Sequence, residues 1–464
     1  MKKIKDLIKN CNIDVDIKGI TDNSTHVKPG YLFVATKGFH VDHYDYVDDA
    51  IHRGCSFVIC DREISYDIPY IVVDHINEYY HELCQNFYDI CLDDFHFIGI
   101  TGTDGKTSTA TMVSQLIPNC AYIGTNGVSV HGREYSTHNT TPCVEELYES
   151  LQKIQKENVS TVVMEVSSEA LLHDRVSPFL FDIVAFTNIT GDHLNVHKTF
   201  ENYFKTKLKL MDLLKEDGIC LMNQDDEYLS QVKGEHIYTY GFQSSDFQIK
   251  SCHYHKEQTV FEVLFKENTY SIKSPFLGTY NVYNVCLSFA IAISYGVQPS
   301  LIQKKIPSLL PIKGRGESLH FGQPYTIILD YAHTIHGIQS VLNTYSHYET
   351  IICVTGAAGG REHEKRKKIG DIIFEFVDIP IFTMDDPREE DPNTIIDEMV
   401  TNHKDYVRII DRKEAIEYAL SIASKGSVVL ILGKGRDSYM AIGKEKIPYC
   451  DYDVIQNYFT SKKQ

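Results

Sequence analysis

The sequence predicts an α/β protein of three domains, with a central P-loop-type, mostly parallel sheet to which antiparallel strands are appended. Three observations predict this fold. A short apolar run, a loop with two glycines and a helix start follow one another between residues 97 and 108. Strand-like runs alternate with helical patterns along most of the chain, which favours parallel sheets covered by helices. At 464 residues, the chain is also too long for one ordinary hydrophobic core.

Residues 1–95 are expected to form a small N-terminal α/β domain. Runs rich in β-branched and aromatic residues at 31–35, 56–60 and 70–73 predict strands. The segment 48–54 predicts the end of a helix, because it finishes with a glycine that can cap the last turn.

Residues 96–312 are expected to form the central domain. After the run at 97–100, strands are predicted at 121–124, 161–166 and 183–187, with helices between them. The segment 236–274 alternates polar with aromatic and apolar residues, which predicts antiparallel strands added to this sheet. An apolar helix is expected at 281–295.

Residues 313–464 are expected to form a C-terminal Rossmann-like domain. Its strands are predicted at 326–330, 350–355, 379–383 and 427–432. Glycine-rich turns at 356–360 and 433–435 directly follow two of these strands. Ligands bind at the carboxyl ends of strands in open parallel sheets, so these turns are candidate binding loops.

Composition excludes several classes of partner. The net charge of −18 argues against nonspecific binding to nucleic acids or anionic membranes. The first residues lack the apolar core of a signal peptide, and no apolar run reaches the length of a membrane span. Twelve scattered cysteines without C-x-x-C spacing indicate reduced thiols, so we expect a cytoplasmic protein.

The loop between Gly102 and Ser108 is the strongest candidate site. Its glycines let backbone N–H groups approach a polyphosphate, and the following helix adds the positive end of its dipole. Lys106 supplies a point charge, and the Thr107 hydroxyl can ligate Mg²⁺. The pattern is a shortened P-loop, because Ile100 stands where the full pattern has a glycine. The alternative interpretation is an ordinary turn.

Two further side chains follow central strands. Glu165 ends a buried-looking strand, where a carboxylate is costly unless it is paired or binds a metal. His193 lies in the loop after the next strand. Because parallel strands end at one sheet edge, Glu165 and His193 can converge with Thr107 on one site. The alternatives are a capping or ion-paired acid and a simple hydrogen-bonding histidine.

Charged residues also follow strands of the C-terminal domain. Asp385, Asp386 and Arg388 follow one strand, and Asp437 follows another. Acids and an arginine at neighbouring strand ends can hold a zwitterion by its ammonium and carboxylate groups. Arg361 belongs to a basic cluster that is either an anion clamp or a solvated helix face. Ordinary turn chemistry remains the alternative for the acids.

Taken together, these motifs resemble the Mur ligase family, specifically its UDP-N-acetylmuramoyl-tripeptide synthetase branch. The segments that carry the resemblance are residues 23–30, 102–108, 139–142, 164–169, 187–193, 203–207, 281–284, 314–315 and 330–334. Two residues depart from the family pattern. Asp104 stands where the phosphate loop usually has Asn, and Glu169 replaces a His.

The resemblance implies ATP-dependent amide formation between UDP-N-acetylmuramoyl-L-alanyl-D-glutamate and a diamino acid, through an acyl phosphate. The third domain would close over the reacting centre and exclude water. The resemblance also implies a cytoplasmic monomer that binds no nucleic acid and does not insert into a membrane.

The resemblance further implies roles for individual residues. The catalytic residues would be Lys106, Glu165, His193 and Lys207. Thr107, Glu165 and His193 would bind one Mg²⁺, and a carbamate on Lys207 would orient a second. The ATP site would comprise Gly102, Thr103, Asp104, Gly105, Lys106, Thr107, Ser108, Asn281, Arg315 and Asp330. The substrate site would comprise Ser24, Asn139, Thr140, Thr141, Ser167, His173, Arg175, Arg361, Asp385, Asp386, Pro387, Arg388, Gly433 and Asp437.

The amino-acid substrate depends on two departures. Diaminopimelate-adding members carry Asp-Asn-Pro-Arg and Gly-Lys-Gly-His-Glu, whereas this chain has Asp-Asp-Pro-Arg at 385–388 and Gly-Lys-Gly-Arg-Asp at 433–437. Arg388 can pair with the distal carboxylate of meso-diaminopimelate, which L-lysine lacks. Asp386 can neutralise Arg388 or attract a lysine ammonium instead. We therefore expect meso-diaminopimelate, with L-lysine as the open alternative.

Two other hypotheses remain. The chain can be another amide ligase of this fold, folylpolyglutamate-like or cyanophycin-like, or a non-catalytic nucleotide-binding paralogue. The segment around Ser24 resembles the family's uridine-nucleotide motif, and the loop 139–142 resembles its muramoyl-substrate loop. Both argue against the first alternative. The joint presence of Lys106, Glu165, His193 and Lys207 argues against the second.

Overall fold

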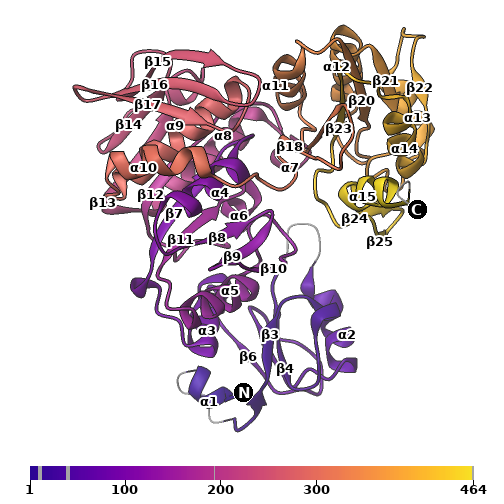
Figure 1. Cartoon of the computed structure of the whole chain (residues 1–464). Coiled ribbons are helices and arrows are strands. Elements are labelled where there is room, and N and C mark those ends of the chain that lie inside the picture. The colour runs from indigo at the N-terminus through magenta and orange to yellow at the C-terminus, as the bar shows by residue number, and fades with distance from the viewer. Residues whose placement is uncertain (9–12, 38–41, 193, 462–464) are drawn as a thin grey trace.

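The computed structural model describes residues 1–8, 13–37, 42–192 and 194–461 (Figure 1). The described chain forms three main sheets, one in each predicted domain. The predicted α/β class is confirmed, whereas the exact domain boundaries at 95/96 and 312/313 stay a proposal. In the described part of the chain, no helix combines the length and apolar character needed to cross a membrane.

The N-terminal sheet is parallel, and its strands are hydrogen-bonded in chain order. The strands are β3 (Gly19–Thr21), β4 (Tyr31–Ala35), β5 (Phe57–Cys60) and β6 (Tyr70–Val72). The helices and the remaining short elements before residue 96 are α1 (Ile4–Leu7), α2 (Val47–His52), α3 (Ile76–Tyr88), β1 (Lys2–Lys3), β2 (Asp16–Ile17), η1 (Ser24–His26), η2 (His43–Tyr46) and η3 (Leu92–Asp94).

The central sheet contains eleven strands among the described residues, in the order β10-β9-β8-β11-β7-β12-β13-β14-β15-β16-β17. The strands are β7 (His96–Thr101), β8 (Cys120–Gly124), β9 (Gly127–Val130), β10 (Arg133–Tyr135), β11 (Thr161–Glu165), β12 (Phe181–Phe186), β13 (Leu214–Asn223), β14 (Ile237–Gly241), β15 (Phe247–Tyr254), β16 (Thr259–Phe265) and β17 (Asn268–Ser274). The strand β7 lies between β11 and β12, parallel to both, so the loop that follows it emerges from the middle of the sheet.

Helices cover both faces of this sheet, and its central strands are apolar on both sides because they are buried. The helices and 3-10 turns of this part are α4 (Lys106–Leu116), α5 (Val144–Lys156), α6 (Ser168–Leu172), α7 (Leu194–His197), α8 (Phe200–Leu208), α9 (Thr279–Ser294), α10 (Pro299–Lys305), η4 (Lys209–Leu213), η5 (Leu229–Gln231) and η6 (Ile306–Ser308). Helix α9 is apolar around most of its surface, since it is packed between α4 and the sheet.

The pairing of the appended strands differs in part from the sequence expectation. Strand β14 pairs in parallel with β13 and with the start of β15, and antiparallel pairing begins only between β15 and β16. The strong alternation of this segment did not distinguish the two, because a parallel strand near a sheet edge also has one solvated face. The antiparallel strands β9 and β10 at the opposite edge were not predicted.

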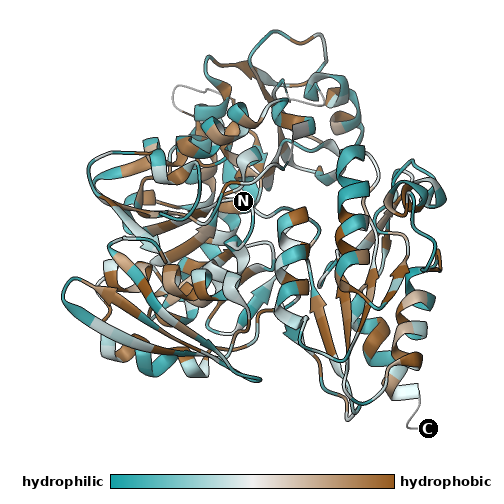
Figure 2. Cartoon of the chain, turned by 90° about the horizontal axis from the view of Figure 1, so that it is seen from above, coloured by the Kyte–Doolittle hydropathy of each residue, from teal (hydrophilic) through white to brown (hydrophobic). Residues whose placement is uncertain are grey.

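The C-terminal sheet has the order β18-β19-β23-β20-β21-β22, and only β18 among these is antiparallel to its neighbour. The strands of this part are β18 (Glu317–Ser318), β19 (Thr326–Asp330), β20 (Thr350–Thr355), β21 (Ile379–Phe382), β22 (Val407–Arg408), β23 (Ser427–Leu432), β24 (Tyr439–Ile442) and β25 (Glu445–Pro448). The helices are α11 (Ile335–Tyr345), α12 (His363–Phe376), α13 (Pro392–Met399), α14 (Arg412–Ile422) and α15 (Asp451–Ser461). In Figure 2 the strands of this sheet are mostly hydrophobic and lie between helices whose outer surfaces are hydrophilic.

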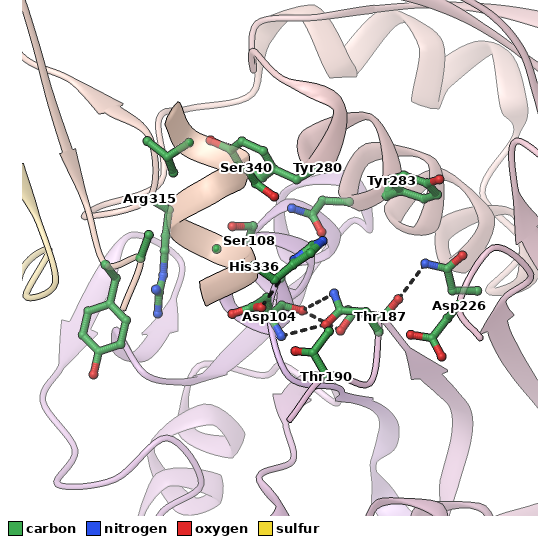
Figure 3. A pocket seen from close by; sticks show the side chains of 18 of the residues that line it. Asp104, Ser108, Thr187, Thr190, Asp226, Tyr280, Tyr283, Arg315, His336 and Ser340 are labelled. Atoms are coloured by element: carbon green, nitrogen blue, oxygen red, sulfur yellow. Dashed lines mark hydrogen bonds and ion pairs between the residues drawn. The ribbon is translucent and has the colours of Figure 1, made fainter. Parts of the chain in front are cut away.

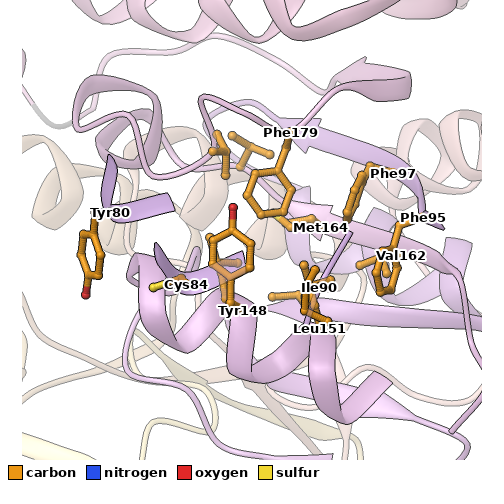
Figure 4. Close-up of a cluster of buried hydrophobic side chains, with 14 of the residues drawn as sticks. Tyr80, Cys84, Ile90, Phe95, Phe97, Tyr148, Leu151, Val162, Met164 and Phe179 are labelled. Carbon is orange, nitrogen blue, oxygen red and sulfur yellow. The ribbon is translucent and has the colours of Figure 1, made fainter. Parts of the chain in front are cut away.

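One hydrophobic cluster joins the N-terminal part to the central sheet (Figure 4). Tyr80 and Cys84 from α3 lie on one side of it, and Tyr148 from α5 lies between them and the sheet. Phe97 and Met164 contribute from the central strands. The two parts therefore share a core, in which helix α3 packs against α5.

Candidate functional site

The phosphate loop connects the end of β7 to the start of α4, and two glycines give it its path. Gly102 and Gly105 have φ values of +144° and +85°, a region that favours glycine. A Cβ on Gly105 would lie 2.5 Å from the Asn284 side-chain oxygen. The loop is anchored from one side, because Thr103 donates its N–H to the Asn188 carbonyl at 2.8 Å. Its remaining face is open to the cavities described below.

Lys106 lies at the first turn of α4 and folds back over the loop. Its ammonium donates to the carbonyl oxygens of Gly102 at 3.0 Å and Thr103 at 2.9 Å. Burial lowers the pKa of Lys106, while the charges of Glu165 and Asp104 act in the opposite direction. An ammonium held over loop carbonyls at a helix N-terminus is suited to bind a polyphosphate.

Glu165, at the end of β11, is fully buried and lies directly beside the start of α4. Its carboxylate accepts hydrogen bonds from the Thr107 hydroxyl at 2.9 Å and the Tyr122 hydroxyl at 2.5 Å. The backbone N–H of Thr125 donates to it at 2.9 Å. A hydroxyl and a carboxylate oxygen in contact beside a phosphate loop are suitable Mg²⁺ ligands. His193, the third expected ligand, lies outside the described residues.

Lys207 belongs to α8, and its side chain is only 2% exposed. Its ammonium donates to the Gly102 carbonyl at 2.7 Å and lies 4.7 Å from the centre of the Tyr203 ring. Burial lowers its pKa, and the nearby charge of Lys106 adds to that effect. Lys205, two residues away, is exposed and pairs with Glu201. Lys207 is therefore buried at the phosphate loop, whereas Lys205 on the same helix lies on its solvated face.

A cavity of about 140 Å³ opens between the phosphate loop and α6. Its lining includes many of the expected substrate residues: Thr103, Lys106, Asn139, Thr140, Ser167, Ser168, Glu169, Arg175, Tyr203 and Lys207. Thr141 lies beneath this lining, where its hydroxyl donates to the Glu165 carbonyl at 2.8 Å and accepts from the Ser167 N–H at 2.9 Å. His173 follows α6 and is not part of the lining.

Ser24 lies in the N-terminal domain, in η1, and not in this cavity. The same turn brings His26 to within 5.4 Å of His138, measured between ring centres, so η1 lies next to the loop that carries Asn139. Farther into this junction, Glu145 of α5 accepts hydrogen bonds from the hydroxyls of Thr21 and Tyr80, at 3.0 and 2.7 Å.

A second cavity, of about 250 Å³, lies between the central and C-terminal sheets (Figure 3). Arg315 lines it, donates to the Thr107 hydroxyl at 3.2 Å and stacks 4.2 Å from the centre of the Tyr331 ring. Asp330 also lines it and accepts the N–H of Ala332 at 2.7 Å. The expected Asn281 lies behind the wall, because its amide bonds to the Leu277 carbonyl at 2.8 Å.

Sequence reasoning did not assign several residues at this second cavity to the site. Asn284, Tyr283, Asp225, Asp226 and His336 line the cavity directly, and Thr334 lies beside it, where its hydroxyl bonds to Asp104. Tyr283, Asn284 and Thr334 do belong to segments that carry the family resemblance. Asn284 is one helical turn from Asn281, so helical spacing alone could have found it. The two acids follow β13 and could have been found as polar residues at the end of a parallel strand.

A third cavity, of about 140 Å³, lies mainly at the carboxyl ends of the C-terminal strands. Its lining includes Arg361, Asp385, Asp386, Arg388, Gly433 and Asp437. Buried Lys434, which was not predicted, binds the carboxylate of Asp386 at 2.8 Å and that of Asp437 at 3.4 Å. Burial raises the pKa of Asp437 to about 6.

Arg388 has a different environment from Asp386. Its backbone is in the left-handed region, with φ of +52°, and its N–H donates to the Ala441 carbonyl at 3.0 Å. Within the described residues, its guanidinium makes no hydrogen bond or ion pair. Pro387 packs its carbonyl against Gly359, where a Cβ would come within 1.9 Å. The loop is thus held by its backbone, and the Arg388 side chain remains available in the cavity.

The phosphate loop, the buried carboxylate beside it and the three cavities at the carboxyl ends of the central and C-terminal strands define an ATP-dependent ligase built from three α/β units. Family profiles agree: "Mur ligase family, catalytic domain" matches residues 16–88, "Mur ligase middle domain" residues 100–292, and "Mur ligase, glutamate ligase domain" residues 314–435. The chain belongs to the Mur ligase family.

Individual relatives extend this comparison. A Bacillus licheniformis protein named UDP-N-acetylmuramoyl-L-alanyl-D-glutamate--2,6-diaminopimelate ligase is 36% identical, over 96% of this chain and 94% of its own length. A solved structure with the same name has a TM-score of 0.64 and 24% identity, and covers 100% of this chain and 99% of its own. The MurF ligase from Thermotoga maritima in complex with ADP has a TM-score of 0.69 and 18% identity, over 96% and 97% of the chains. The two structures show the fold alone.

Proposed function

We propose that this ligase joins meso-diaminopimelate to UDP-N-acetylmuramoyl-L-alanyl-D-glutamate, with cleavage of ATP to ADP and phosphate. The observation that carries this proposal is the position of the phosphate loop, which borders both the first and the second cavity. Asp192, which lines the third cavity, binds Lys365 at 3.0 Å across the central and C-terminal parts. Substrates in the three cavities would therefore meet where the central and C-terminal parts face each other.

The chemistry requires an activated acid, because a carboxylate does not acylate an amine in water. ATP would phosphorylate the γ-carboxylate of the D-glutamate, and the amine would attack the resulting acyl phosphate. Phosphoryl transfer depends on positioning and on neutralising charge. Lys106, which bonds to the Gly102 carbonyl, and Arg315, which bonds to the Thr107 hydroxyl, are suited to neutralise the phosphates. Gly102, Thr103, Gly105 and Ser108 would hold them through the loop and the first turn of α4.

Two Mg²⁺ ions are part of the proposal. Thr107, Glu165 and His193 would hold the first, and a carbamate on Lys207 would orient the second. The contact between Thr107 and Glu165 supports the first site. The buried amine of Lys207 supports the second, since an uncharged amine is the form that adds CO₂. When bound, Mg²⁺ would neutralise phosphate charge and orient the oxygens in the first cavity.

The acid substrate would extend from the first cavity toward the N-terminal domain. Asn139, Thr140, Ser167 and Arg175 line or border the path for its peptide part. The η1 turn with Ser24 would receive the uridine nucleotide, because it faces the loop that carries Asn139.

The preference for meso-diaminopimelate over L-lysine rests on the different environments of two neighbours. Asp386 is already neutralised by Lys434 at 2.8 Å, so its charge is less available for a lysine ammonium. The guanidinium of Arg388 is available for the second carboxylate of diaminopimelate. Asp437, Asp385 and Arg361 would bind the amino-acid end of the substrate.

Phosphate release with a panel of amino acids tests the proposal. The purified protein is given UDP-N-acetylmuramoyl-dipeptide, ATP and Mg²⁺, with meso-diaminopimelate, L-lysine, L-ornithine or no amine. We expect release with meso-diaminopimelate only. Release with L-lysine but not diaminopimelate would overturn the role of Arg388, and no release with any amine would favour a nucleotide-binding protein without ligase activity. We further propose a cytoplasmic monomer, which light scattering of the purified protein tests.

A further inference from the structure

Asp104 places a carboxylate in the phosphate loop, where the family pattern that this loop resembles has a neutral asparagine. The backbone of Asp104 is held by the central domain: its N–H donates to the Asn188 side chain at 3.0 Å, and its carbonyl accepts the Thr187 hydroxyl at 2.6 Å. With the backbone held on that side, the carboxylate faces the C-terminal domain. Figure 3 shows His336 lying directly beside it.

The partner of this carboxylate is the N-terminus of α11, a helix of 11 residues. Thr334 caps the helix, since its hydroxyl accepts the Gly337 N–H at 2.9 Å, and the same hydroxyl lies 3.2 Å from both carboxylate oxygens of Asp104. His336 Nδ1 lies 3.8 Å from one of these oxygens. The positive end of the helix dipole adds to the attraction.

We propose that Asp104, Thr334 and His336 form an interdomain latch, which holds the C-terminal domain against the phosphate loop most firmly when His336 is protonated. The latch connects residues that are about 230 positions apart: the phosphate loop on one side and the first turn of α11 on the other. Both sides line the second cavity. His336 and Asp104 are thus positioning residues for the closure of that cavity.

An asparagine at position 104 would not make the same latch. Its amide oxygen could still accept the Thr334 hydroxyl, but it would carry no charge to attract a histidinium. Hydrogen bonds and contacts to ionised partners are roughly twice as strong as neutral ones. With Asp rather than Asn at position 104, the strength of this contact therefore depends on whether His336 is protonated.

Several charged groups surround this pair. His333 precedes Thr334, Lys106 begins α4, Asp226 follows β13, and Asp330 ends β19. The interaction with Asp104 raises the pKa of His336; burial acts against this, and the charge of Asp226 adds to it. Burial alone would raise the pKa of Asp104, but His336, His333 and Lys106 outweigh burial and lower it.

The sign of the pH dependence follows from the raised pKa. The latched state binds the His336 proton more tightly than the open state does. The contribution of the ion pair is fully present below the ordinary histidine pKa of about 6.5, and it is lost as the pH rises through the raised pKa of His336. Closure should therefore weaken between neutral and alkaline pH.

Histidine titration of the full-length protein without substrates tests the latch. The His336 signal is assigned by its loss in His336→Asn, and its pKa is measured by NMR in the wild type and in Asp104→Asn. We expect a value above 6.5 in the wild type and a fall of at least about half a unit in Asp104→Asn. An unchanged His336 pKa in Asp104→Asn would overturn the proposal.

Small-angle scattering supplies a second readout. The radius of gyration of the wild type should increase between pH 6 and pH 8.5, and this response should be lost in Asp104→Asn and in His336→Asn. His347→Asn is the matched control, because His347 is exposed beyond the other end of α11 and should leave the response unchanged. An undiminished response in Asp104→Asn would contradict the latch.

Both measurements are independent of catalysis. Failure of the amino-acid panel would overturn the proposed function without affecting the His336 titration, and an unaltered titration would remove the latch without affecting the ligase reaction. If both hold, the KM for ATP in the wild type should rise toward pH 8.5, and this rise should be smaller in Asp104→Asn.

Discussion

Two lysines, Lys207 buried and Lys106 half-buried, converge on a single carbonyl oxygen beside the phosphate loop. Lys106 and Lys207 donate to Gly102 at 3.0 and 2.7 Å, although they come from different helices. Each ammonium raises the free energy of the other, and burial adds to this cost. Such an arrangement is unfavourable for stability alone. It becomes favourable when anions neutralise it, which is what phosphates, and a carbamate on Lys207, would do.

Lys207→Ala tests the carbamate. We expect activity to fall by roughly 100-fold or more, because an anion that orients a metal in the reacting centre is lost. Short carboxylates such as formate or acetate should restore part of the activity, measured as phosphate release. Lys205→Ala, on the exposed face of the same helix, is the control and should stay near the wild-type rate. Wild-type turnover in Lys207→Ala would remove the carbamate proposal.

Arg388→Ala tests whether the third cavity binds the amino-acid substrate as proposed. Loss of one charge-assisted contact should raise the KM for meso-diaminopimelate by about 10- to 100-fold, with little change in the KM for ATP. The matched control is Lys444→Ala in the adjacent β24–β25 turn, whose side chain is 89% exposed. An unaltered KM for diaminopimelate in Arg388→Ala would mean that another group binds the distal carboxylate.

At the scale of elements, a buried ion pair connects the starts of two helices to the end of a strand next to the third cavity. Arg412 begins α14 and is fully buried. It binds Asp451 at the start of α15 through two hydrogen bonds of 2.9 and 2.8 Å, and it donates to the Leu432 carbonyl at the end of β23 at 2.8 Å. This arrangement fixes the strand end that is followed by Gly433, which lines the cavity, and by Lys434, which binds Asp386.

Asp451→Asn should destabilise the C-terminal domain. Removing one partner of a buried ion pair leaves an uncompensated charge and costs about 3–5 kcal/mol. Urea unfolding, followed by a signal from residues 313–464, should show the loss. Asp453→Asn, at an exposed position two residues further along α15, is the control and should change stability little. Equal stability of Asp451→Asn and the wild type would show that water or another group compensates Arg412.

At the scale of the whole molecule, the central domain is held by two junctions of different chemistry. The N-terminal junction is an apolar core with a buried acid, Glu145, at its edge. The C-terminal junction is polar: Arg315 reaches Thr107, Thr334 reaches Asp104, and Lys365 reaches Asp192. Polar junctions open at lower cost than shared cores. The C-terminal domain is therefore the part expected to move during the reaction cycle.

Glu145 makes the N-terminal junction sensitive to pH. Burial and the neighbouring Asp22 raise the pKa of Glu145 to about 7, from an ordinary value of 4.5. The folded state thus binds this proton more tightly than the unfolded state, so stability falls as the pH rises from 4.5 through 7. Glu145→Gln should stabilise the junction at pH 8 by on the order of 1 kcal/mol, and by less at pH 5.

Thermal unfolding of the wild type and the variant at both pH values measures this difference. Glu149→Gln on the same helix is the control, because Glu149 is half exposed and pairs with Lys153. A difference between wild type and Glu145→Gln that does not change with pH would contradict the raised pKa.

Much of the fold followed from local patterns. Apolar runs of four to six residues became the strands β7, β11, β12, β20 and β23, because strands buried on both faces must be apolar throughout. The loop at 102–105 was predictable for the same local reason, since its glycines, Lys106 and Thr107 are consecutive. The pairing direction of β14 was not predictable, because alternation does not distinguish parallel from antiparallel edges.

The sequence by itself determined the family, the three α/β units and the residue types at the strand ends. Only the tertiary structure decided which of these residues meet: Tyr122 with Glu165, Lys434 with Asp386, and His336 with Asp104. The physical reason is the separation in sequence between the residues that interact. Strand formation, helix capping and glycine turns depend on neighbours in the chain, whereas burial, charge pairing and the pKa values that follow depend on residues brought together by packing.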